Sequence, residues 1–133
     1  MQSLSDLKNQ PPFDETVLER MSQKASALLS RAAIGLYTQA LVLCTDGGEY
    51  GAVISNALTA EKAEEHALLN ALRDARDTRV RYVLCMWGDG NIDLPSHAFR
   101  ILLRELDSQN DESLIFVNTK NGLAVVKLQI TVK

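Results

Sequence analysis

The residues that could do chemistry gather in two short stretches of the sequence. EKAEEHALLNAL (61–72) carries His66, one of two histidines in the chain, directly after two glutamates. LPSHAFRILLREL (94–106) carries the other, His97. A histidine beside carboxylates can bind a metal ion or move a proton. Both stretches also have the apolar spacing of an amphipathic helix, in which a histidine is an ordinary boundary or surface residue.

A metal site made from the two histidines and Glu64 or Glu65 would require the starts of both helices to converge. The two cysteines do not add to such a site, because Cys44 and Cys85 each lie inside an apolar run. Their positions indicate buried, reduced thiols, which favours a cytoplasmic protein. We therefore expect no metal and no cofactor, and we expect both histidines to be structural or surface residues.

Composition narrows the classes of function. The chain has 133 residues, the usual size of one domain, and a net charge of −3. The negative charge argues against nucleic acid, since phosphate-backbone binding needs a basic face. No apolar run approaches the roughly 20 residues that cross a bilayer, so we expect no membrane partner. Residues 1–13 are polar up to two prolines and predict a flexible N-terminal segment, and residues 14–133 predict a single domain.

The elements that must position these residues follow from periodicity and turn signals. Asp14 can cap a first helix, and Asp46-Gly47 between two apolar runs is a strong hairpin signal. In chain order we expect a helix from Asp14, strands at 39–45 and 49–56, a helix at 59–75, a strand at 80–87, a helix from Pro95, and strands at 113–118 and 122–130. The alternation predicts a three-layer α/β/α sandwich with a five-stranded mixed sheet.

Details of these elements bear on function. Ala67, Leu68, Ala71 and Leu72 are expected to share the sheet-facing side of the second helix. The strand at 80–87 should lie parallel to the strand at 113–118. The stretch GDGN (88–91) is interpreted as a solvated turn. Trp87 and Tyr82 are candidates for interface anchors, although an aromatic at such a strand position more often belongs to the core.

This element order, with its two helix openings, resembles the cytidine deaminase family. The family signature is a metal ligand, any residue and Glu, followed later by Pro-Cys-x-x-Cys. The first part falls on Lys62-Ala63-Glu64 and the second on Pro95-Ser96-His97-Ala98-Phe99-Arg100. The resemblance covers about residues 14–130 and implies the cytidine deaminase-like fold. It also implies a functional site where the second and third helices begin.

The resemblance places the three zinc-ligand positions at Lys62, Ser96 and Phe99. In the family, zinc lowers the pKa of a bound water and the glutamate carries its proton. An ammonium repels zinc, a hydroxyl is a poor ligand and a phenyl ring is none. Glu64 is the one position of catalytic type that matches. We expect Lys62 to form an internal ion pair with Glu64 or Glu65 and, together with Phe99, to fill the former metal site as packed core.

The substrate side of the family pattern is also altered. The resemblance assigns sugar contacts to an Asn and a Glu that correspond here to Val53 and Ser55, and the Asn one residue further on matches Asn56. Whatever pocket remains would be lined by residues near the two helix starts. These candidates are Asn56, Glu64, Glu65, His66 and His97.

The resulting hypothesis is a deaminase-fold protein that is catalytically inactive and acts through protein–protein binding. It could be an immunity protein that neutralises a basic toxin, or a regulatory subunit, and it could be homo-oligomeric as the family commonly is. Acidic residues would supply charge complementarity to a basic partner. They are Glu61, Glu64, Glu65, Glu105, Asp107, Asp111 and Glu112. The alternative is a nucleotide- or metabolite-binding protein, or a metal-independent enzyme, that reuses the pocket around Glu64.

Overall fold

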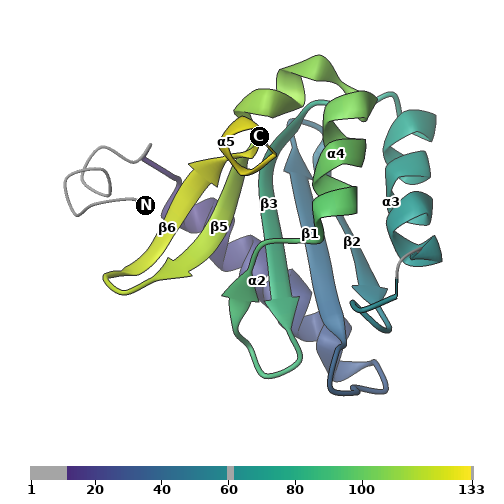
Figure 1. Ribbon diagram of the computed structural model, residues 1–133, viewed down its shortest axis with the longest axis vertical. Coiled ribbons are helices and arrows are strands. Elements are labelled where there is room, and N and C mark those ends of the chain that lie inside the picture. The colour runs from purple at the N-terminus through teal and green to yellow at the C-terminus, as the bar shows by residue number, and fades with distance from the viewer. Residues whose placement is uncertain (1–11, 60–61, 133) are drawn as a thin grey trace.

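The computed structural model describes residues 12–59 and 62–132. A mixed sheet has the strand order β2-β1-β3-β5-β6, with a short β4 also paired to β3. Helix α2 covers one face of the sheet, and α3 and α4 cover the other (Figure 1). The elements are α2 (Glu15–Ser30), β1 (Gln39–Thr45), β2 (Gly48–Ile54), α3 (Ala63–Asp74), β3 (Val80–Trp87), β4 (Ile92–Asp93), α4 (His97–Leu106), a 3-10 helix η1 (Ser108–Glu112), β5 (Leu114–Thr119), β6 (Gly122–Lys127) and α5 (Leu128–Thr131). The three-layer α/β/α sandwich expected from the sequence is confirmed.

The pairing of the strands also follows the expectation, with one addition. β1 and β2 form the antiparallel hairpin, and β3 lies parallel to β5. Among the described residues the sheet has six strands and not five, because the chain folds back after the turn at 88–91 and Ile92 pairs with Met86 of β3. This two-residue strand is too short to leave a periodic pattern in the sequence.

Two boundaries differ from the sequence prediction by more than two residues. α3 begins at Ala63 after Lys62, four residues later than expected, and the intervening positions 60–61 lie outside the described residues. β6 ends at Lys127, and a turn of helix follows where a strand to residue 130 was expected. The reason is Leu128, which is fully buried and whose N–H donates to the Ser113 carbonyl at 2.8 Å. That contact turns the chain out of the sheet.

The core is divided by the sheet into two clusters. On one side Met21, Ala25 and Leu29 of α2 pack against the strands. On the other side α3 and α4 pack together with their own apolar residues, which are Leu68, Leu69, Leu72, Phe99 and Leu103. This shared cluster holds the two helices next to each other, so their starts lie at the same end of the sheet (Figure 1).

The buried face of α3 is rotated from the one predicted. It consists of Glu65, Leu68, Leu69 and Leu72, at the i, i+3, i+4, i+7 spacing, whereas the alanines at 67 and 71 are exposed. The larger leucines bury more apolar surface than alanines, so they decide which side faces the sheet. The consequence is that Glu65 is carried into the interior.

The N-terminal segment is described only in part. Residues 1–11, expected to be flexible, lie outside the described residues. Phe13, which the sequence assigned to the same segment, instead packs edge-on against Phe116, with ring centroids 5.3 Å apart. Within residues 12–59 and 62–132, no helix combines the length and the apolar character that a bilayer-crossing segment needs.

Candidate functional site

The starts of α3 and α4 meet through a direct hydrogen bond between side chains. The Ser96 hydroxyl donates to Oε2 of Glu65 at 3.1 Å and accepts from the Phe99 N–H at 3.1 Å. Ser96 is therefore the N-cap of α4, because it satisfies a free N–H of the first turn. One small side chain thus joins both helix starts and leaves its hydroxyl fully engaged.

Glu65 is a carboxyl group inside the protein, with 4% of its surface exposed. Burial raises its pKa, while the charge of Lys62 and the hydrogen bond from Ser96 oppose that rise. Lys62 is itself buried, at 6% exposure. However, among residues 12–59 and 62–132 no ion pair shorter than 4.0 Å joins Lys62 to Glu64 or Glu65. The expected close ion pair is therefore not formed, and the two charges interact at longer range.

Glu64 has a different environment and a specific structural partner. Its Oε2 accepts hydrogen bonds from the N–H and the hydroxyl of Ser55, at 3.2 and 2.9 Å. Its own backbone N–H and the Ser55 hydroxyl lower its pKa, so the carboxylate stays ionised. The bond to Ser55 links the end of β2 to the first turn of α3. This link gives a structural reason for an acidic residue at position 64.

The donor set at Lys62, Ser96 and Phe99 does not fit a zinc ion. Zinc in proteins takes thiolate, imidazole or carboxylate ligands. Position 62 carries an ammonium, the hydroxyl of Ser96 is already used twice, and the ring of Phe99 has no donor atom and no solvent exposure. In the described part of the chain, no group of three or more His, Cys, Asp or Glu side chains is arranged to hold a metal.

The remaining candidates from the sequence line neither of the two described pockets. His66 and His97 are exposed at the starts of their helices. The side chain of Asn56 turns back on its own loop, where Oδ1 accepts from the Leu58 N–H at 3.0 Å. The structure thus brings Glu65, Lys62, Ser96 and Phe99 together in the interior. It leaves the histidines on the surface.

Most of the acidic side chains proposed for a basic partner form ion pairs or hydrogen bonds within this chain. Asp111 pairs with Arg104 at 2.6 Å and Glu112 with Lys127 at 2.8 Å. Asp107 caps η1 by accepting from the Gln109 N–H. Glu64 and Glu65 are engaged as described above, and Glu61 lies outside the described residues. Charge complementarity to a basic partner therefore has fewer free carboxylates than the sequence suggested.

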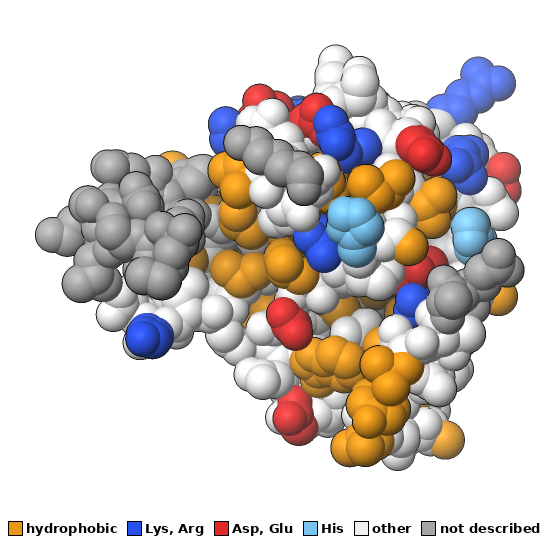
Figure 2. All heavy atoms as spheres, in the orientation of Figure 1, with side chains coloured by type: hydrophobic (Ala, Val, Ile, Leu, Met, Phe, Trp, Pro, Cys, Tyr) orange, Lys and Arg blue, Asp and Glu red, His pale blue; other side chains and the backbone are white. Residues whose placement is uncertain are grey.

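A different region of the surface is more distinctive. Side chains that are apolar and exposed gather where β1 begins and β2 and β3 end, and Figure 2 shows an orange group at this lower edge of the molecule. We call this region the apolar end; its members are Ile34 (51% exposed), Leu36 (83%), Tyr37 (40%) and Leu58 (66%). The N–H of Ala57 donates to the carbonyl of Tyr37 at 2.8 Å, which holds the two loops side by side.

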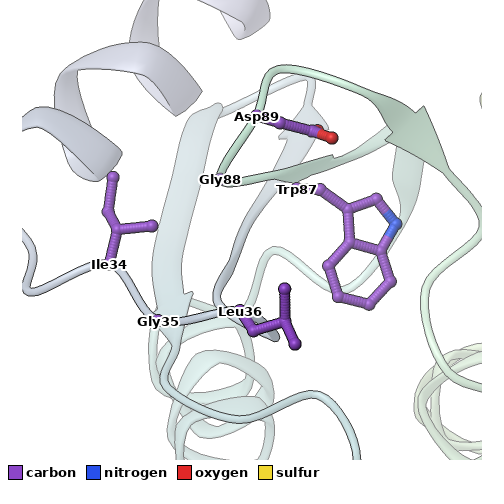
Figure 3. A pocket seen from close by; sticks show the side chains of 6 residues that line it. All are labelled: Ile34, Gly35, Leu36, Trp87, Gly88 and Asp89. Carbon is purple, nitrogen blue, oxygen red and sulfur yellow. The ribbon is translucent and has the colours of Figure 1, made fainter.

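A pocket of about 340 Å³ opens at the apolar end (Figure 3). Its lining comes from two loops that are distant in sequence, and consists of Ile34, Gly35, Leu36, Trp87, Gly88 and Asp89. The sequence predicts only a solvated turn at 88–91, and it places Trp87 either in the core or in an interface. The sequence feature that could have indicated the pocket is a tryptophan at the end of a strand followed by Gly-Asp. The same feature fits a core residue and an interface residue equally well.

Comparison with solved structures finds cytidine deaminases. The enzyme from Mycobacterium leprae superposes with a TM-score of 0.60 at 21% identity, over 81% of this chain and 92% of that chain. The enzyme from Mycobacterium tuberculosis gives 0.61 at 16% identity, over 86% and 92%. A mutant of the latter gives 0.64 at 14% identity, over 90% and 95%. These similarities show that the chain has the cytidine deaminase fold. No family model and no curated protein matches the sequence.

Proposed function

We propose that this protein uses the cytidine deaminase fold without deaminase chemistry and acts by binding another protein. The observation that carries the proposal is the apolar end, where Leu36 and Leu58 expose 83% and 66% of their surface beside Ile34 and Tyr37. Apolar side chains exposed together cost free energy in water and are typical of surfaces that a partner covers.

The interior at the two helix starts supports the non-catalytic part of the proposal. Phe99 has no exposure, and the hydroxyl of Ser96 is bonded to Glu65. A zinc-activated water would need both an ion and open space at this point. The alternative function is a metabolite site around Glu64, which is a half-buried, ionised carboxylate. This alternative has less support, because the carboxylate is hydrogen-bonded to Ser55 and both described pockets are lined by other residues.

Two biological forms are compatible with a binding role. The first is an immunity protein that neutralises a basic toxin, and the second is a regulatory subunit, either with a different chain or as a homo-oligomer. A cytoplasmic location belongs to both forms. The apolar end favours a partner that covers apolar surface, and Asp89 at its pocket adds negative charge that suits a basic one.

The chemical half of the proposal is tested by zinc content and by cytidine turnover. Purified protein incubated with zinc and dialysed should retain no stoichiometric metal and should not convert cytidine or deoxycytidine. A variant with Lys62→Cys, Ser96→Cys and Phe99→Cys restores thiolates at the three positions and should gain one zinc per chain. Stoichiometric zinc in the wild type, or deamination by it, would refute the proposal.

The binding half is tested with a matched pair of surface variants. Leu36→Glu with Leu58→Glu places charge on the apolar end, and Ile130→Glu makes the same change at a residue that is 51% exposed elsewhere. Affinity capture with wild type and with Ile130→Glu should retain a protein that the double variant loses. That protein, once purified, should bind with a dissociation constant in the micromolar range or below. Binding unaffected by the double variant would contradict the assignment of the surface.

A further inference from the structure

The pocket at the apolar end is built from two walls that face each other. One wall precedes β1 and the other follows β3 (Figure 3). In the close view, the side chain of Leu36 points toward the indole of Trp87. Glycine at position 88 lets the two walls approach each other closely. A Cβ placed on Gly88 would lie 2.6 Å from Cγ2 of Ile34, too close for an unaltered structure.

Backbone hydrogen bonds hold the two walls together. The N–H of Gly88 donates to the carbonyl of Thr38 at 3.0 Å, and the N–H of Gly35 donates to the Thr38 hydroxyl at 2.8 Å. The N–H of Trp87 donates to the carbonyl of Asn91 at 2.8 Å, which closes the turn. Thr38 is 1% exposed, so this junction is anchored in the interior. A pocket held in this way needs little ordering when it is filled, which favours affinity.

The indole of Trp87 is oriented by a carboxylate. Its Nε1–H donates to Oδ2 of Asp93 at 3.3 Å. This bond satisfies the polar edge of the ring and leaves its aromatic faces to be contacted. The face of an indole carries negative electrostatic potential and attracts cations, most strongly among the aromatic side chains.

The charges at the pocket are all of one sign. Asp89 lines it, and Oδ1 of Asp89 accepts from the Asn91 N–H at 2.9 Å, which fixes the direction of the carboxylate. Asp93 lies at the polar edge of the indole. None of the six lining residues is lysine or arginine. The pocket therefore combines apolar walls, an aromatic face and a carboxylate at its rim.

We infer that this pocket accepts an arginine side chain of a partner protein whose sequence differs from that of this chain. The guanidinium stacks on Trp87 and pairs with Asp89, while the three methylene groups lie against Leu36 and Ile34. Arginine fits better than lysine because its planar cation both stacks and forms directed hydrogen bonds. The inference rests on the proposed binding function and names the chemistry of the partner at this point.

Other occupants fit the observed chemistry less well. A purely apolar anchor would cover Asp89 without giving its charge a partner, which costs free energy. A small organic cation would fill the pocket but leave Tyr37 and Leu58 exposed beside it. A partner chain that carries arginine within an apolar surface covers both, and arginine and aromatic residues are typical of interface hot spots.

The pocket can be tested directly because Trp87 is the single tryptophan of the chain. The intact protein is titrated with N-acetylarginine methylamide, its neutral isostere N-acetylcitrulline methylamide, and methylguanidinium, with tryptophan fluorescence as the readout. The arginine probe should bind roughly fivefold more tightly than the citrulline probe, the combined effect of a cation over an indole and an exposed ion pair. It should also bind more tightly than methylguanidinium, which lacks the methylene groups.

Asp89→Asn should remove most of the preference for arginine over citrulline. Asp74→Asn, which neutralises an exposed carboxylate at the far end of α3, should leave the preference unchanged. Equal binding of arginine and citrulline probes would overturn the inference. Methylguanidinium binding as tightly as the arginine probe would also overturn it, because a free cation would then suffice.

This test is independent of the partner-capture experiment. If the pocket does not prefer arginine but Leu36→Glu with Leu58→Glu still abolishes partner binding, the arginine inference is wrong. The proposed binding function is then unaffected. Conversely, partner binding that the double variant does not weaken removes the assignment of the apolar end as the binding surface, whatever the titration gives. Self-association of the wild type that the double variant abolishes would identify the occupant as a second copy and overturn the assignment to a different partner.

Discussion

Removing the ring of Phe99 tests whether the start of α4 is packed core or encloses space that a ligand could use. Phe99 is fully buried in the cluster that joins α3 and α4 to the sheet. Truncation of such a side chain to alanine loses both the transfer free energy and the packing around the cavity, about 3–5 kcal/mol in total. Domains of this size have a free energy of unfolding of about 5–15 kcal/mol, so Phe99→Ala removes a large share of it.

Urea unfolding followed by far-ultraviolet circular dichroism measures this loss, and thermal unfolding provides a second measure. With a shift of roughly 3–5 °C for each kcal/mol in a domain of this length, the melting temperature should fall by about 10–20 °C. Leu102→Ala on the same helix is the matched control. Leu102 is only half-buried, so its truncation should cost about 1 kcal/mol.

The result that refutes this reasoning is a small loss. If Phe99→Ala costs less than about 1 kcal/mol, or no more than Leu102→Ala, the ring is not packed against its neighbours. The helix starts would then enclose space that a ligand could use. That outcome would favour the alternative function around Glu64 and would require a search for metabolites that stabilise the wild type.

Three further predictions concern the two glutamates and the pocket. Because burial raises the pKa of Glu65 above its ordinary value of 4.5, the wild type should lose stability as the pH rises from 4.5 through the raised pKa. The urea midpoint of Glu65→Gln should not fall over the same pH range. Because hydrogen bonds lower the pKa of Glu64, its carboxylate stabilises the fold above pH 4.5, and this stabilisation is lost on acidification. Glu64→Gln should therefore be less stable than the wild type at pH 7 and should lose less stability between pH 7 and pH 3. An equal loss of stability in both proteins over this pH range would contradict the hydrogen bond to Ser55. Gly88→Ala should narrow the pocket against Ile34 and weaken the fluorescence response to the arginine probe, whereas an unchanged response would place the probe elsewhere.

The architecture was predictable because long elements carry their own periodic signals. The apolar run of β3 and the Asp46-Gly47 turn specify a covered central strand and a hairpin. Short elements were not predictable, since β4 has two residues and α5 has four. Their formation depends on contacts across the fold, such as the bond from Leu128 to Ser113, which no local pattern encodes.

The candidate site was also predictable only in part. The resemblance located Lys62, Ser96 and Phe99, and the structure places all three near the starts of α3 and α4. The burial of Glu65 was missed, although the spacing of Glu65 with the leucines at 68, 69 and 72 is a regular helical stripe. A charged residue at the end of such a stripe is ordinarily assumed to face water, and here the hydrogen bond from Ser96 makes the interior position tolerable.

The pocket at the apolar end could not be predicted, because its walls are separated by about fifty residues of sequence. They meet only because β1 and β3 are neighbours in the sheet and Thr38 connects both loops. In this chain the helix starts carry closed polar contacts, and the exposed apolar and aromatic groups lie at the adjacent strand ends. A scaffold whose sheet brings two loops together can therefore present a binding surface at those loops without a change of fold. On this basis, substitutions at Leu36, Trp87 and Asp89 should affect binding more than stability, and substitution of Phe99 should do the opposite.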